Sequence, residues 1–304
     1  MIVIIGSGMA GLACARRLAD TGQAAIVLDK GRGMGGRVAT QRVGDWQFDH
    51  GAQYVNAHGA GFAAALARLS VAGWQDGTGR SHSVGVPGMS AIPRALGVGL
   101  DVRQGVQVTG LQQDGDGWVV QLGGSLLRAA RVVVTVPAPQ VSGLLGVDHP
   151  LVAVLAPVRL APCLTLMAAT TGPAPFITRQ DGDDPLSWIA QDSAKPGRPQ
   201  GPDTQWVAQA GEAFSLAHLE NSPEEIAALM LPLLCDQLGV APDRVTHAAA
   251  HRWRHARVTQ ALGQPFLRSP DATLYLGGDW CIGPRVEAAW TSGTAIADAI
   301  LAQG

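Results

Sequence analysis

The first residues whose spacing could do chemistry are three glycines near the start of the chain, Gly6, Gly8 and Gly11. They follow an aliphatic run over residues 1–5, which predicts a strand buried on both faces, and they open a helical pattern. In such a turn the first glycine makes a tight bend, the second lets the backbone approach a pyrophosphate, and the third lets helix and strand pack closely. The next strand ends on Asp29, whose carboxylate can accept hydrogen bonds from a ribose diol. The pattern predicts a dinucleotide site with its phosphates at the helix N-terminus.

The residues after Asp29 indicate which dinucleotide binds. Residues 31–37 form a glycine-rich loop where a nicotinamide-binding unit would enter another helix, and Arg37 can return to the pyrophosphate as a bidentate donor. This stretch resembles the FAD-binding signature of the amine oxidase superfamily, an acid followed by a short loop and Gly-Gly-Arg. The resemblance implies that Asp29 holds the adenosine ribose, that Arg37 holds the pyrophosphate, and that the cofactor is FAD. Two positions depart from it, because Asp29 stands where glutamate is commoner and Gly31 where many members have a second arginine.

The resemblance extends the expected cofactor site to later segments. It implies that residues 51–54 lie beside the flavin ring, that the backbone of Val108 meets the adenine edge, and that the turn at Gly278 and Asp279 holds ribitol or phosphate. The helix that starts near Val286 would direct its N–H groups at the flavin N1–C2=O edge, where negative charge develops on reduction. The expected cofactor-binding residues are Gly6, Ser7, Gly8, Met9, Ala10, Gly11, Asp29, Lys30, Gly36, Arg37, Gly51, Ala52, Gln53, Val108, Gly278, Asp279, Arg285, Val286 and Ala289.

Apolar runs and turn residues predict the elements that must position this site. We expect a parallel sheet built from strands at residues 1–5, 24–28, 131–136 and 273–276. Alternating strands at 101–108 and 118–122 are joined by a turn at 114–117. Helical patterns cover residues 12–19, 62–69, 91–100, 223–238 and 286–301. Ser90 is expected to cap the third of these, and Pro223 with two acids opens the fourth.

The sequence between residues 138 and 261 differs in composition and pattern from the rest. Prolines cluster there, and alternating strands are predicted at 164–169, 186–191 and 205–210. Three such strands predict an antiparallel sheet, one face of which can roof a flavin site. We interpret Trp188 and Trp206, on two of these strands, as sheet core rather than as a substrate platform.

The expected fold class is therefore α/β. An FAD-binding Rossmann-like domain of the glutathione-reductase and amine-oxidase type is interleaved with a smaller α+β substrate domain that contains the antiparallel sheet. We expect residues 1–56, 88–137 and 262–304 to form the FAD-binding domain and residues 57–87 and 138–261 to form the substrate domain.

Composition limits the partners and the compartment. The 304 residues carry a formal net charge of −2, which makes no electrostatic case for nucleic acid or a membrane surface, and no apolar run is long enough to span a membrane. Four scattered cysteines without a Cys-x-x-Cys motif exclude disulfide reductases and metal fingers and fit a reducing cytoplasm. The turn at 114–117 lacks the ligand spacing of a calcium loop, so no metal is expected. We also expect non-covalent FAD, because no cysteine lies just upstream of the last strand, where covalent members carry theirs.

The residues expected near the flavin weaken an amine oxidase reading. Superfamily amine oxidases sandwich their substrate between two aromatic side chains, one of them at the entry to the last helix, where this chain has Arg285. A guanidinium there would repel an alkylammonium. These enzymes also often place a lysine near flavin N5, and none lies between Arg159 and Thr170, the expected equivalent strand.

Along nearly its whole length the chain resembles the bacterial renalase branch of the superfamily. The matching segments are 29–37, 48–54, 186–190, 193–198, 251–254, 278–280 and 286–290. The resemblance implies oxidation of 2- and 6-dihydro isomers of NAD(P) to NAD(P)+, by hydride transfer to flavin N5 with O2 as acceptor and H2O2 as product. Because aromatisation of a dihydropyridine needs no protein base, the site needs only an aromatic slot that orients the substrate.

We expect Tyr54, His251 and Trp290 to line that slot, with Arg285 near the substrate or the flavin. The basic run at 251–257 is then either a surface strand or a face toward an anionic substrate. A flavin amine oxidase, or another small-substrate oxidoreductase, stays open as an alternative, as does a non-catalytic FAD-binding protein.

Overall fold

The protein, described here over residues 1–303 by a computed structural model, is organised around a six-stranded sheet of mainly parallel strands. β1 lies at its centre between β11 and β2, and its four aliphatic residues are buried on both faces, as the apolar run predicted. The sheet order is β17 (Leu267–Arg268), β18 (Leu274–Leu276), β11 (Arg131–Val134), β1 (Ile2–Ile5), β2 (Ala25–Asp29) and β7 (Asp101–Gln104).

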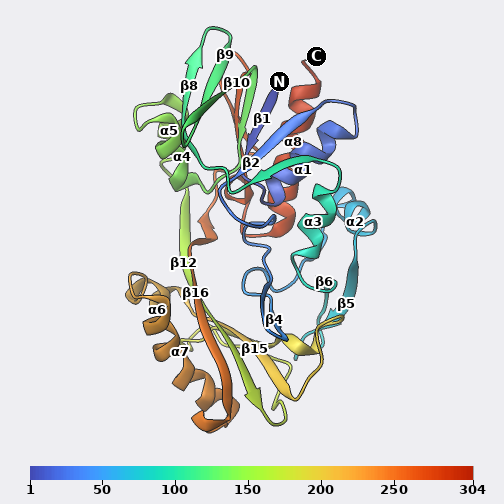
Figure 1. Ribbon diagram of the computed structural model, residues 1–304, viewed down its shortest axis with the longest axis vertical. Coiled ribbons are helices and arrows are strands. Elements are labelled where there is room, and N and C mark those ends of the chain that lie inside the picture. The colour runs from blue at the N-terminus through green and yellow to red at the C-terminus, as the bar shows by residue number, and fades with distance from the viewer. Residues whose placement is uncertain (304) are drawn as a thin grey trace.

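The two faces of this sheet are covered by different layers. Helices α1 (Met9–Ala19) and α8 (Val286–Leu301) pack on one face, where Leu18 and Ile296 join the β1 side chains in a single core. The other face carries the antiparallel sheet of β8 (Val108–Asp114), β9 (Gly117–Leu122) and β10 (Ser125–Ala129), and with it α4 (Ala138–Leu145) and α5 (Pro150–Val154). Both chain ends lie on this part of the molecule (Figure 1).

A five-stranded antiparallel sheet forms the opposite end of the molecule, as the alternating pattern predicted (Figure 1). Its order is β13 (Thr178–Gln180), β14 (Trp188–Gln191), β15 (Asp203–Gln209), β12 (Arg159–Thr171) and β16 (Val245–Gln260). Helices α6 (Glu212–Ala217) and α7 (Pro223–Leu238) lie along one face, and Ile226, Met230 and Leu234 of α7 are fully buried there. A capping box between Ser222 and Glu225 starts α7 at the predicted residue.

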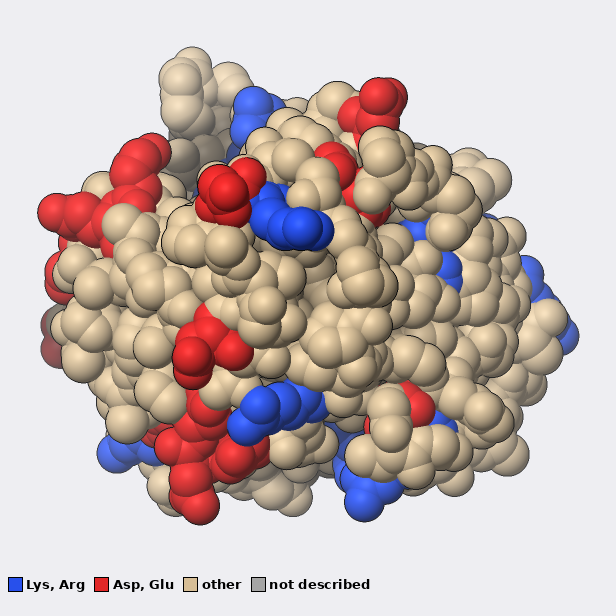
Figure 2. Space-filling model, turned by 90° about the horizontal axis from the view of Figure 1, so that it is seen from below, with Lys and Arg blue, Asp and Glu red and all other residues tan. Residues whose placement is uncertain are grey.

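The remaining strands and helices are short. They are β3 (Gln41–Val43), β4 (Trp46–Phe48), α2 (Ala60–Leu66), β5 (Val71–Gln75), β6 (Ser81–Gly85), α3 (Ala91–Gly97) and the short 3-10 turns η1 (Asp192–Ala194), η2 (Pro242–Arg244) and η3 (Asp279–Cys281). None of the helices among residues 1–303 combines the length and the apolar composition needed to cross a membrane. On the face shown in Figure 2, most acidic side chains lie toward the left and lower left of the view, and the basic side chains are scattered over the face.

Three sequence expectations are wrong in detail. The strand expected over 101–108 is divided, because Gly105 adopts a φ of +70°, so that β7 ends in the parallel sheet and β8 begins the hairpin. The helix expected over 91–100 ends at Gly97. Ser90 does not cap it with its side chain, since its own backbone is already helical, with a φ of −64° and a ψ of −11°.

Residues 138–158 pack on the parallel sheet and not in the substrate domain to which the sequence analysis assigned them. Ala138, Val141, Leu155 and Val158 are buried in the same core as Val3, on the parallel sheet. We therefore propose that the FAD-binding domain continues to about residue 158, and that the substrate domain begins with β12.

Candidate active site

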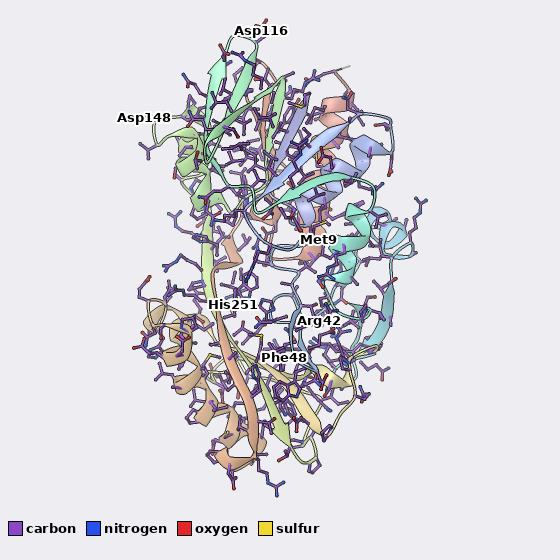
Figure 3. The ribbon with its side chains drawn as sticks, in the orientation of Figure 1. Met9, Arg42, Phe48, Asp116, Asp148 and His251 are labelled. Carbon is purple, nitrogen blue, oxygen red and sulfur yellow. The ribbon has the colours of Figure 1, made fainter. Side chains whose placement is uncertain are left out.

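A large cavity of about 1730 Å³ lies between the two large sheets. One side is formed by the loops at the carboxyl ends of β1, β2, β11 and β18, the edge at which open α/β sheets bind ligands, and the other side by β14, β15 and β16. Figure 3 shows Met9 of α1 and His251 of β16 in the middle of the molecule, on the two sides of this space. The volume exceeds the roughly 300–1,000 Å³ of an ordinary ligand pocket, so a dinucleotide leaves room for a second ligand.

The structure brings most of the predicted site residues to this cavity. Those that line it are Gly6, Gly8, Met9, Ala10, Asp29, Lys30, Gly36, Arg37, Gly51, Ala52, Gln53, Tyr54, Val108, His251, Gly278, Asp279, Arg285, Val286 and Ala289. Ser7, Gly11 and Trp290 do not line it. Ser7 is fully buried, and Gly11 packs so closely on the first turn that an added Cβ would lie 1.9 Å from the Gly6 carbonyl oxygen.

Trp290 does not occupy the substrate slot that the sequence expectation gave it. Its indole ring lies 5.5 Å from the ring of Phe62 in α2, and its edge faces Gly61, so the helix turns this side chain away from the cavity.

Asp29 joins the two loops at one edge of the cavity. Its Oδ2 accepts hydrogen bonds from the backbone N–H of Ser7 at 2.5 Å and from the Ser7 hydroxyl at 2.8 Å. Its Oδ1 accepts one from the N–H of Gly31 at 2.6 Å. The carboxylate is thereby held in place at the cavity edge, where a ribose would meet it.

The middle of the cavity has the form of a phosphate cradle. Gly8 lines the cavity and pairs with Gly35 of the second loop, and a Cβ added to Gly8 would meet no atom within 4 Å, so a side chain there would fill the cradle itself. Arg37 forms a bidentate ion pair with Asp279, with N–O distances of 2.6 and 2.8 Å, and donates to the Ala256 carbonyl at 3.0 Å. Its guanidinium is therefore fixed beside the cradle by protein partners, and the glycines and the α1 N-terminus fit a pyrophosphate.

The far end of the cavity is formed by the segment at 51–53 and by the start of α8. Gly51 is required there, because a Cβ would lie 2.0 Å from the carbonyl oxygen of Arg37. The Gln53 amide donates to the backbone oxygens of Asp49 and Gly51, and its Oε1 accepts a hydrogen bond from Lys195 at 3.1 Å. No side chain caps α8, so its first N–H groups are free to meet negative charge.

Behind Gln53 lies a cluster of four charged side chains that the sequence reasoning missed. Asp49, Asp192, Lys195 and Arg198 all have fully buried side chains. Lys195 contacts Asp192 at 2.6 Å and Asp49 at 3.6 Å, and Arg198 pairs with Asp49. Two sequence signals pointed to these residues: Asp49, Lys195 and Arg198 lie in segments that resemble the renalase branch, and the chain has just two lysines, of which one stands beside a Pro-Gly-Arg.

The two carboxyl groups of this cluster differ in their pKa. Burial raises the pKa of Asp192, and the negative charge of Asp49 adds to that effect. Burial opposes ionisation of Asp49 as well, but Lys195 and Arg198, with hydrogen bonds from Thr40 and Met89, hold its pKa below the usual value. Asp49 is therefore the more acidic of the two carboxyl groups.

Aromatic side chains also line the cavity. They are Tyr54, Trp188, Trp253, His251 and His255. The interpretation of Trp188 as core is wrong, since it lines the cavity with its ring 5.9 Å from that of Tyr54, whereas Trp206 is core and 1% exposed. The alternation of β14 and β15 could not show which face would be covered by α7.

The histidines of this wall are held neutral. Burial, reinforced by the neighbouring His251, lowers the pKa of His50 to about 4, and burial also lowers the pKa of His251. The pKa of His255 is lowered by burial and then by Arg254, Arg37 and Lys30.

Cys163 is the one cysteine among the residues that line the cavity within the described chain. Burial raises the pKa of its thiol to about 11, so it is not a thiolate at neutral pH and is a poor nucleophile. We predict that acid or heat denaturation releases all of the bound flavin into the supernatant after precipitation of the protein. Flavin absorbance that stays with the washed precipitate would contradict this prediction.

No group of three or more His, Cys, Asp or Glu side chains among residues 1–303 is placed to hold a metal ion.

Comparison with protein-family models finds that residues 74–301 match the flavin-containing amine oxidoreductases and that residues 4–69 match an NAD(P)-binding Rossmann-like domain.

Solved structures share the whole fold at low sequence identity. A protein described as a protoporphyrinogen oxidase from Exiguobacterium has a TM-score of 0.78 at 13% identity, over 100% of this chain and 99% of its own. A mutant of putrescine oxidase has a TM-score of 0.77 at 14% identity, over 100% of this chain and 99% of its own. Cyclohexylamine oxidase from Brevibacterium oxydans has a TM-score of 0.76 at 13% identity, over 99% and 98%.

Proposed function

The chain belongs to the flavin-containing amine oxidoreductase family, and from that premise we propose that it is a renalase-like oxidase of dihydronicotinamide dinucleotides. The protein is an FAD-dependent oxidoreductase of this family, with a Rossmann-like FAD-binding domain. In the proposed reaction, 2- or 6-dihydro-NAD(P) loses a hydride to become NAD(P)+. Bound FAD would supply the hydride acceptor, and O2 would then take up the two electrons, the transferred hydrogen and one proton from solvent to give H2O2. We place the protein in the cytoplasm, with a dihydronicotinamide dinucleotide and O2 as its partners.

The charge of the cavity lining is the observation that supports this substrate best. Six lysine and arginine side chains line the cavity, namely Lys30, Arg37, Arg252, Arg254, Arg257 and Arg285, against three carboxylates. Each carboxylate is already engaged: Asp29 accepts from Ser7 and Gly31, Asp279 pairs with Arg37, and Glu212 pairs with Arg257 at 3.2 Å.

This lining favours an anionic substrate over an alkylammonium. None of the cavity carboxylates is free to pair with an ammonium group, and Arg285 makes no ion pair with any carboxylate of residues 1–303. A dinucleotide carries a pyrophosphate that a free guanidinium attracts. Tyr54 and Trp188 supply aromatic surfaces for the nicotinamide, and the neutral histidines add no further charge.

The reductive half-reaction tests the proposal directly. The purified holoprotein is mixed anaerobically with 2-dihydro-, 6-dihydro- and ordinary 4-dihydro-NAD(P), and with a panel of amines, while flavin absorbance is followed. Rapid bleaching by a 2- or 6-dihydro isomer, with H2O2 on admission of air, is the expected result. Bleaching by amines alone would overturn the substrate class, and the absence of any bleaching would favour a non-catalytic FAD protein.

Arg285 provides a matched test of the electrostatic argument. Replacing Arg285 with glutamine should raise the KM for the dinucleotide about tenfold, the effect of roughly one charge-assisted hydrogen bond to phosphate. The flavin spectrum should stay unchanged. Arg285→Lys keeps the charge, so its KM for the dinucleotide should be close to that of the parent protein. Equal KM values for the glutamine and lysine variants would contradict an electrostatic role for Arg285.

The proposal also predicts a flat pH profile. Flavin reduction by the dihydro substrate should vary little between about pH 6.5 and 8, because His251 and His255, which line the cavity, have pKa values below the ordinary value of about 6.5. No proton has to leave the substrate before the hydride does. An observed rate constant that rises steeply across this range would instead indicate a substrate or a base that must lose a proton.

A flavin amine oxidase is the second candidate, since two of the solved structures with this fold are named as putrescine oxidase and cyclohexylamine oxidase. In that case the substrate ammonium, with an ordinary pKa near 10, would have to be deprotonated before hydride loss. Rates for an amine would then increase with pH, which separates the two candidates in the same experiment.

A further inference from the structure

A second cavity, of about 530 Å³, lies beside the large one and has an unusual lining. Arg32, Arg42 and Arg94 line it, from three separate segments: the glycine-rich loop after β2, strand β3 and helix α3. No aspartate or glutamate is among its lining residues. None of the three guanidinium groups forms an ion pair or a hydrogen bond within residues 1–303.

Such a concentration of free positive charge is unexpected in a chain with a net charge of −2. Eight of the twenty arginines form an ion pair within residues 1–303, as Arg37 does with Asp279 and Arg254 with Glu220. The three arginines are exposed side chains that line one space without an acidic partner, and an anion in that space would attract all three. The lining therefore favours a negatively charged ligand.

A buried histidine adds a second, independent observation. His50 lines the same cavity, is only 7% exposed, and its Nδ1 has no hydrogen-bond partner in the described chain. Buried ring nitrogens normally have a partner, and a neutral imidazole with its proton on Nδ1 can donate to an oxyanion. Ser90 also lines the cavity, and its side chain makes no cap bond to α3, so its hydroxyl is available there.

We propose that this second cavity binds a phosphate group, through Arg32, Arg42 and Arg94 at its rim and His50 within it. The planar guanidinium fork matches phosphate oxygens in pairs, and three forks from separate segments satisfy a tetrahedral dianion better than a single charge could. Figure 3 shows Arg42 in the middle of the molecule, between the two large sheets, so the site opens near the large cavity and not at either end.

The site is separate from the pyrophosphate cradle of the cofactor. Gly36 and Trp253 line both cavities and form the wall between them. The Trp253 indole N–H donates to the backbone oxygen of His50 at 2.8 Å, and the two rings stack with centroids 5.3 Å apart. Phosphate on one side of this wall therefore changes the surroundings of an indole that also faces the flavin cavity. The phosphate is either a free anion or the 2′-phosphate of an NADP-type dinucleotide.

Calorimetry on the FAD-loaded protein tests the proposal. Sodium phosphate is titrated at about pH 7.5, above the second phosphate pKa of roughly 6, with sodium chloride at matched ionic strength as the reference. We expect saturable binding of phosphate and none of chloride. Arg42→Gln and Arg94→Gln should each weaken phosphate about tenfold, whereas Arg68→Gln, which removes an exposed arginine outside both cavities, should leave the affinity unchanged. Flavin content and melting temperature verify that each variant is folded.

Competition then identifies where the phosphate comes from. If NADP+ displaces phosphate and NAD+ does not, the site takes the 2′-phosphate of a dinucleotide; if neither does, it takes a free anion or another phosphomonoester. Equal heats for phosphate and chloride would overturn the proposal. So would an unchanged phosphate affinity in both cavity variants, or an equal loss in Arg68→Gln.

Discussion

Replacing Gly293 with alanine should lower the free energy of unfolding by about 3 kcal/mol or more and deplete the bound FAD. Gly293 lies where α8 crosses α1, and an added Cβ would stand 2.0 Å from the carbonyl oxygen of Ala10 and 2.8 Å from its carbonyl carbon. Backbone atoms cannot rotate away as a side chain can, so the two helices must separate. Because Ala10 lines the cofactor cavity, a displacement of α1 should also move the backbone of the phosphate cradle.

Thermal unfolding and the flavin-to-protein absorbance ratio measure this effect. A fall in melting temperature of roughly 5–10 °C is expected. The matched control for stability is Gly143→Ala in α4, another helical glycine, whose added Cβ would meet no protein atom within 4 Å; because Gly143 lines the cavity, the two variants are compared in melting temperature and not in FAD content. That change should leave stability unchanged or raise it by up to about 1 kcal/mol, since alanine is the better helix former. Equal melting temperatures for the two variants would show that α1 and α8 can adjust to the added methyl group.

Replacing Lys195 with methionine should cost about 3–5 kcal/mol of stability at neutral pH, the usual result of removing one partner from a buried ion pair. The variant keeps a similar side-chain length but leaves Asp49 and Asp192 facing each other with only Arg198 to balance them. Gln53 also loses the donor to its Oε1, so the flavin end of the cavity should loosen. The matched control is Arg68→Met, which removes an exposed positive charge outside the cavity and should leave stability nearly unchanged.

The pH dependence of this loss has a definite sign. In the parent protein the pKa of Asp49 is lowered, so its contribution is present above the ordinary carboxyl pKa and is lost as the pH falls through the folded value. Without Lys195, both carboxyl groups should have raised pKa values, and their penalty is relieved as the pH falls through them. Denaturant unfolding of both proteins at about pH 7 and pH 5 should therefore show a smaller difference at pH 5. A difference that grows on acidification would contradict the cluster as described.

Much of the cofactor side of this protein could be predicted from the sequence, because its determinants are local. A run of aliphatic residues before Gly6 can only be a buried strand, and the spacing to Gly8 and Gly11 is set by the turn that enters α1. Asp29 ends β2, and Arg37 follows the glycine-rich loop directly after it. The resemblance to FAD proteins therefore predicted a place in the cofactor site for each residue. The antiparallel sheet was also predictable, since strand alternation is a local property.

The substrate side could be predicted only in part, because it depends on which face of an element meets which neighbour. Trp188 and Trp206 lie on adjacent strands with similar sequence patterns, but α7 covers one face of that sheet, leaving Trp188 in the cavity and Trp206 in the core. Trp290 sits one residue after the cavity-lining Ala289, and the helical rotation of about 100° per residue directs it to Phe62 instead. A resemblance between sequences does not show in which direction the helix points each side chain.

The sequence by itself determined the dinucleotide fold, the turn that receives the phosphates, and the carboxylate at the end of β2, because each depends on residues next to one another in the chain. Only the tertiary structure decided that Lys195 lies fully buried against Asp49 and Asp192, and that Arg32, Arg42 and Arg94 surround one cavity. These groups come from segments far apart in sequence. Their charges act on one another through space over a few ångströms, and that distance is set by the packing of the two sheets and the loops between them.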